Sequence, residues 1–140
     1  MRRIDNNDAM FYLDTLISTS FALIEADQDF FRGSLLAMYQ LSASKGTQSP
    51  EHEFSRRAAD VVTRGCVIAH EQGLLLGQIR AETMGMQMYT VYAAHWREWA
   101  YRRLPIEEFR NNVQQGFYMC LCADAAPQFM LLLRDKMAAL

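Results

Sequence analysis

Histidine and cysteine are the residue types of this chain that most often bind metal ions or attack substrates, and there are three of each. His52, His70 and His95 lie far apart, and none belongs to a His-Glu-x-x-His or Glu-x-x-His motif. Cys120 and Cys122 are two residues apart on an expected helix, so their side chains point about 200° apart and cannot chelate one ion together. We therefore expect no metal site and no cofactor.

Motifs of covalent catalysis are also missing from the sequence. There is no Gly-x-Ser-x-Gly turn, no glycine-rich phosphate loop and no convincing Cys–His pairing. The carboxylates Asp14, Glu25 and Asp60 are interpreted as helix caps or solvent-facing charges. We predict that the chain is not an enzyme. A small helical enzyme, with a site assembled from distant residues, is the weakest of three hypotheses.

Composition narrows the function further. The 140 residues, about half of them apolar, fit one globular domain over 1–140. Lys plus Arg is 14 and Asp plus Glu is 16, so the chain lacks the basic footprint that DNA binding needs. An odd number of cysteines favours a reducing cytoplasm over a disulfide framework. No secretory signal and no apolar run of about 18–20 residues are evident, so we expect a cytoplasmic protein without a membrane partner.

Apolar residues at three- and four-residue steps predict an all-α fold, a single bundle of about six helices. The expected helices cover about 8–25, 29–42, 50–72, 80–103, 106–123 and the chain from 127 onward. Between the second and third lies a predicted loop, Ser44–Pro50, in which Ser49 caps the next helix and Pro50 opens it. Gly73 is predicted to end the third helix, and Pro105 to stop the fourth.

The fourth and fifth predicted helices are apolar around most of their circumference. A helix on the surface of a monomer needs only one apolar stripe, so a second covering is expected. In a domain of this size another copy of the chain is the simplest covering. We therefore predict a homodimer, with Ala93, Val113, Phe117 and Leu121 in its interface.

The second half of the chain has a definite order of helices and helix ends. Glu71–Gly73 closes one helix, a short turn leads into a long helix with Trp96 and Trp99, and Ile106–Phe109 opens the next helix after Pro105. This order resembles the C-terminal ligand-binding domain of TetR-family transcriptional repressors, in which the last two helices of each subunit form a four-helix dimer interface. The resemblance extends over nearly the whole chain.

The family's N-terminal helix-turn-helix domain has no counterpart in this sequence. The chain is therefore interpreted as the sensor half of a longer regulator or as a stand-alone relative. The resemblance implies DNA binding only through a domain that is not present here.

A sensor domain needs an apolar pocket with a few polar groups, and methionines and aromatic rings supply adaptable walls. The predicted ligand-binding residues all lie on the fourth helix: Met84, Met88, Tyr92, His95, Trp96 and Trp99. We expect an apolar or aromatic small-molecule effector that prefers one arrangement of the helices and so modulates DNA binding by a parent protein. The alternative hypothesis is a helical interaction or dimerisation module without a ligand.

Overall fold

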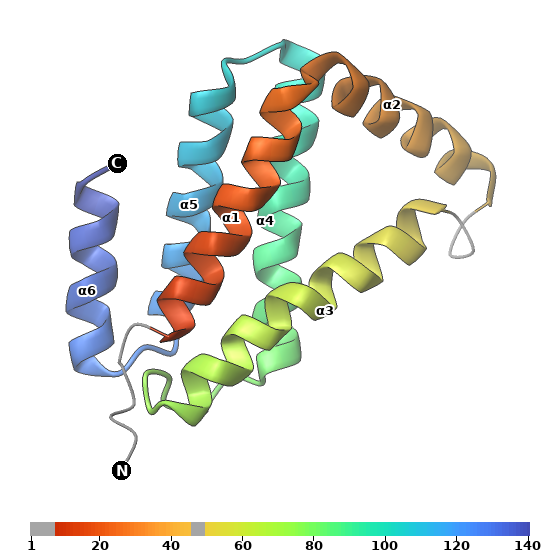
Figure 1. Ribbon diagram of the computed structural model, residues 1–140. Helices are drawn as coiled ribbons and strands as arrows, with labels where there is room; N and C mark the ends of the chain where they lie inside the picture. The colour runs from red at the N-terminus through yellow and green to blue at the C-terminus, as the bar shows by residue number, and fades with distance from the viewer. Residues whose placement is uncertain (1–7, 46–49) are drawn as a thin grey trace.

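The computed structural model describes residues 8–45 and 50–140, and this part of the chain is a bundle of six helices (Figure 1). The helices are α1 (Asp8–Ala26), α2 (Gln28–Lys45), α3 (Pro50–Glu71), α4 (Ala81–Arg102), α5 (Ile106–Cys122) and α6 (Pro127–Ala138). The all-α prediction is confirmed. The largest boundary difference is at α2, which continues through Ser44 to Lys45 instead of ending at Ser42. The predicted cap at Ser49 lies outside the described residues.

The bundle is built around an antiparallel pair, α4 and α5 (Figure 1). Helix α1 packs against α3 and α5, α3 crosses α4 obliquely, and α6 packs on the outer side of α5. Helix α2 leaves the end of α1 at the top of the view and runs toward the beginning of α3, and it contacts both α3 and α4. Helices far apart in the sequence, α1 and α5, therefore share one core.

Two close helix approaches determine how tightly α4 packs. A β-carbon at Gly85 of α4 would lie 2.8 Å from the Thr63 Cα of α3, so these helices meet backbone to backbone. On the other side, Gly116 of α5 leaves room only for the Val91 side chain of α4. Helix α4 thus packs closely against both neighbours at these two points.

Helix α1 supplies a fully buried stripe to the core. Leu13, Ile17 and Phe21 are each at most 3% exposed. By length and composition Ala9–Ala26 could also span a membrane, so the prediction that no apolar run reaches this length is wrong. Such helices are weak indicators, because the core helix of a globular bundle passes the same test. Here one third of that window is buried, and Phe11 and Leu23 of the same helix are exposed.

Asp14 connects α1 with the C-terminal helices. Its carboxylate accepts a hydrogen bond from the Tyr118 hydroxyl of α5 at 2.9 Å and one from the Lys136 ammonium of α6 at 2.7 Å. The interpretation of Asp14 as a cap or a solvent-facing charge is therefore wrong. Glu25 and Asp60, in contrast, are exposed.

Gly73 ends α3, as its place in the sequence predicts. It has a φ of 74°, its amide donates to the carbonyl of His70 at 3.0 Å, and the amide of Leu74 donates to the carbonyl of Ala69 at 2.9 Å. This pair of bonds is the Schellman motif, which satisfies the last carbonyls of a helix. The chain can then turn sharply toward α4.

The turn between α3 and α4 is held by the turn between α5 and α6. Leu75 and Ala125 form an isolated antiparallel bridge. The buried Asp124 carboxylate accepts hydrogen bonds from the amides of Gly77, Gln78 and Ile79. Both helix pairs are therefore tied together at the same end of the bundle.

Candidate functional site

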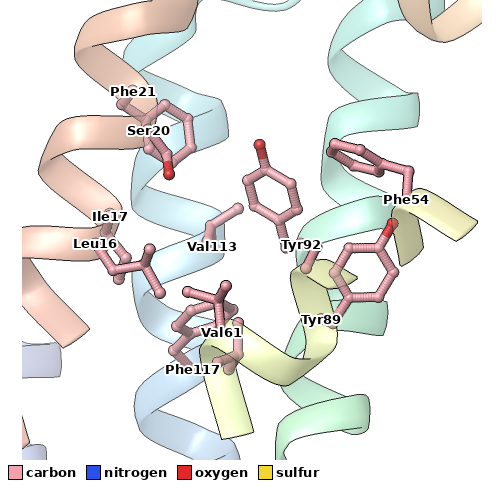
Figure 2. A pocket seen from close by; sticks show the side chains of 12 residues that line it. Leu16, Ile17, Ser20, Phe21, Phe54, Val61, Tyr89, Tyr92, Val113 and Phe117 are labelled. Carbon is pink, nitrogen blue, oxygen red and sulfur yellow. The ribbon is translucent and has the colours of Figure 1, made fainter. Parts of the chain in front are cut away.

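A cavity of about 190 Å³ lies between α1, α3, α4 and α5 (Figure 2). Its walls are Leu16, Ile17, Ser20 and Phe21 of α1, Phe54, Ala58, Val61 and Val62 of α3, Tyr89 and Tyr92 of α4, and Val113 and Phe117 of α5. None of these twelve side chains is charged. Val113 and Phe117 are buried, whereas Phe54 and Val61 are 40% and 44% exposed, so α3 provides the rim.

Three hydroxyl groups are the polar side-chain atoms of this cavity. Figure 2 shows the Ser20 hydroxyl extending from α1 and the Tyr92 ring from α4, on opposite walls of the same space. Tyr89 is engaged, because its hydroxyl lies 3.0 Å from the Ser55 Oγ. The structure records no hydrogen bond between the Tyr92 hydroxyl and a described residue. Tyr92 is therefore the group best placed to recognise a polar atom of a ligand.

Burial controls the ionisation of Tyr92. Loss of solvent raises the pKa of its phenol above the usual value, and the neighbouring Tyr89 raises it further. The group therefore stays neutral at physiological pH. A neutral phenol can both donate and accept a hydrogen bond.

Aromatic rings surround Tyr92 on the inner side of the cavity. The centroid of its ring lies 6.5 Å from that of Phe21, 6.0 Å from that of Phe109 and 5.7 Å from that of Trp96. Edge and tilted arrangements at these distances are the favourable ones for aromatic pairs. A planar ring entering the cavity would meet the same kind of surface.

Of the six predicted ligand-binding residues, only Tyr92 lines the cavity. Trp96 lies behind the wall, against Tyr92 and Phe54. Met84, Met88 and Trp99 are buried elsewhere in the core, and His95 is half-buried outside the lining.

Three of the four predicted interface residues point inward. Val113, Phe117 and Leu121 are at most 3% exposed within one chain, so they offer little surface to a second copy. The apolar circumference of α5 arises because α1, α4 and α6 cover it from different sides. Ala93 of α4 is half-buried.

A different face of α4 and α5 is open to solvent. Beside the close contact of Val91 with Gly116, α4 exposes Gln87, Thr90 and Ala94, and α5 exposes Gln115 and Met119. We call these five exposed residues the outward stripe. They are uncharged, and Met119 is 59% exposed.

Sequence reasoning missed the contribution of α1 and α3 to the cavity. Leu16, Ile17 and Phe21 belong to a helical apolar stripe, but the same spacing describes ordinary core. Ser20 was the available signal, because it places a hydroxyl inside that stripe. The oblique crossing of α3 brings Phe54 and Val61 to the rim. The sequence of α4, from which the ligand-binding residues were predicted, does not indicate this crossing.

No group of histidine, cysteine or acidic side chains that could hold a metal ion occurs among the described residues. The chain was also compared with family models, curated proteins and solved structures, and nothing matches it. The resemblance to the TetR-family sensor domain thus rests on its residues alone.

Proposed function

We propose that the chain is the effector-binding and dimerising domain of a transcriptional regulator of the TetR type. A small apolar or aromatic molecule would bind inside each bundle. It would modulate DNA binding by a helix-turn-helix domain that this chain does not contain, in the cytoplasm. The observation that carries the proposal is the uncharged cavity between α1, α3, α4 and α5.

The position of the cavity supports an allosteric role. Four helices contribute walls, so a molecule that fills the space favours the helix spacing that best fits it. Helix α4 carries Tyr89 and Tyr92 on its inner side and Thr90 on the outward stripe. A ligand that prefers one spacing shifts the population toward it by its differential affinity. Because α4 borders the cavity on one side and carries the outward stripe on the other, a change in its position would reach a second copy bound at the stripe.

The outward stripe supports the dimer. Charged residues are depleted from the centres of protein interfaces, and the stripe has none over about two turns of α4. The small side chains of Thr90 and Ala94 would allow helices of a second copy to approach closely. Met119 would supply an apolar contact at one end.

The ligand part of the proposal is tested by a thermal-shift screen of small apolar compounds against the purified chain. We expect hits that stabilise the protein, because a ligand that binds only the folded state raises its melting temperature. Ala58→Leu narrows the cavity at α3 and should abolish these shifts. Ala22→Leu, at an exposed position of α1, is the matched control and should keep them. A screen without any hit would refute effector binding.

The dimer is tested by native mass spectrometry at micromolar concentration. We expect a dimer of the wild-type chain and a monomer of Met119→Glu. Leu131→Glu places the same charge on α6 at a residue 65% exposed, and should leave the dimer intact. A wild-type monomer, or equal effects of both substitutions, would contradict an interface at the outward stripe.

The second candidate is a helical interaction module without a ligand, and the exposed Met119 and its uncharged surroundings favour it. Both candidates predict the dimer. Only the sensor predicts thermal shifts that Ala58→Leu removes, so the screen distinguishes them.

A further inference from the structure

We propose that the cavity takes a neutral, single-ring aromatic molecule with one hydroxyl or carbonyl group. This inference rests on the proposed function, since it names the chemical class of the effector. It is argued from the volume of the cavity, the absence of charge from its twelve lining side chains and the position of its hydroxyl groups.

Volume limits the ligand to about one ring. An apolar cavity of about 150 Å³ in a protein interior is known to hold benzene. The cavity of about 190 Å³ described above leaves room for a ring with one or two small substituents. The aromatic side chains of Phe21, Tyr92 and Phe117 offer the edges and faces that a planar ring prefers.

The lining excludes an ionised ligand. Moving an unpaired carboxylate or ammonium ion into apolar surroundings is very costly unless an opposite charge meets it. No lining residue carries a charge, and Tyr92 itself is held in its neutral form. A carboxylate analogue of an otherwise suitable ring should therefore be rejected.

The hydroxyls favour one polar group on the ring. Ser20 and Tyr92 extend from opposite walls, and each can donate or accept a hydrogen bond (Figure 2). A hydroxyl on the ligand could satisfy either of them, whereas a carbonyl could accept from either. A hydrocarbon of the same shape would offer the hydroxyl of the half-buried Tyr92 no hydrogen bond.

The test uses three probes that share one methyl-substituted ring: p-cresol, toluene and p-toluate. Titrations followed by ligand-observed NMR at neutral pH measure their dissociation constants. We expect p-cresol to bind about fivefold tighter than toluene, as one additional hydrogen bond provides, and p-toluate not to bind. Ala58→Leu should remove the binding of both neutral probes.

Tyr92→Phe keeps the ring and removes only the hydroxyl. It should equalise the affinities of p-cresol and toluene without changing that of toluene. Tyr101→Phe removes an exposed hydroxyl of α4 outside the cavity and should keep the preference for p-cresol.

Tighter binding of p-toluate than of p-cresol, or an unchanged preference for p-cresol over toluene in Tyr92→Phe, would overturn the proposed ligand class. The class would also be overturned if none of the three probes bound while compounds from the screen bound the wild-type chain and not Ala58→Leu. In each of these cases effector binding itself would stand. Failure of the probes together with the entire screen would instead refute the proposed function.

Discussion

The Asp124 carboxylate lies 3.0 Å from the amide nitrogen of Gly77, across two turns separated by 47 positions in the chain. Gly77 has a φ of 83°, a left-handed conformation that glycine adopts without steric cost. This conformation turns its amide, and those of the next two residues, toward one carboxylate. One buried acidic side chain therefore organises the turn into α4, the helix that carries Tyr89 and Tyr92.

Asp124→Asn should destabilise the fold by about 2–4 kcal/mol. The asparagine side chain has one acceptor oxygen and one NH2 donor, so it cannot accept all the hydrogen bonds that the two carboxylate oxygens accept from the amides of the turn. Urea denaturation followed by circular dichroism measures the change. Asp135→Asn, at an exposed position of α6, is the control and should have an effect below about 0.5 kcal/mol. Equal effects of the two substitutions would mean that the bonds to Gly77, Gln78 and Ile79 contribute little.

The helices could be predicted because their signals are local. Pro50, Gly73, Pro105 and Pro127 mark helix boundaries through backbone geometry that the residue type itself imposes. The bonds of Asp124 and Asp14 could not be predicted in this way. Their partners are 45 or more positions distant, and nothing in the spacing of single residues encodes which turns or helices meet.

Of the cavity lining, only Tyr92 was predicted, because the lining too depends on how distant helices meet. An apolar stripe shows which side of a helix is inward, but not whether the inward residue fills space or borders it. Tyr92 and Met88 are one turn apart on α4, yet only Tyr92 lines the cavity. Met88 instead meets the Cys66 thiol, 3.6 Å from its sulfur. The difference depends on where α3 crosses.

Gly85→Ala tests the contact between α3 and α4. The added β-carbon would meet the Thr63 backbone, so the helices must separate, at a cost of about 1–3 kcal/mol. Gly33→Ala is the matched control on α2, where no atom lies within 4 Å, and should stabilise by about 0.5–1 kcal/mol. Urea denaturation measures both changes in the free energy of unfolding. Changes of the same sign in the two variants would contradict this packing.

Alkaline pH should destabilise the protein through Tyr118. Burial raises the pKa of its phenol, and the charge and hydrogen bond of Asp14 raise it further. The unfolded chain releases this proton near pH 10, whereas the folded chain retains it, so stability is full below pH 10 and falls above it.

The loss is at most about 1.4 kcal/mol per pH unit for each such group. Melting temperatures between pH 9 and pH 11 measure it. Tyr118→Phe should flatten the decline above pH 10, and Tyr101→Phe should not. A decline that is the same in all three proteins would assign the effect to other groups.

Cys66 should be chemically inert in the folded protein. It is fully buried, and burial raises the pKa of its thiol to about 12, with a smaller contribution from Cys120. The thiolate is the reactive form, so alkylation at pH 8 requires a thiol that is both accessible to solvent and ionised. Cys66 meets neither requirement. Half-buried Cys122 should be labelled first by iodoacetamide, as peptide mass spectrometry would show.

Labelling of Cys66 should begin only as urea reaches the unfolding transition, because global opening is then required to expose it. Met88→Leu removes the sulfur that faces this thiol but keeps the apolar packing, so protection of Cys66 should persist in that variant. Rapid labelling of Cys66 in native buffer, at the rate of Cys122, would instead show that α3 separates locally from α4 and α5. The same separation would open the wall of the cavity at Val62, four residues before Cys66 on α3.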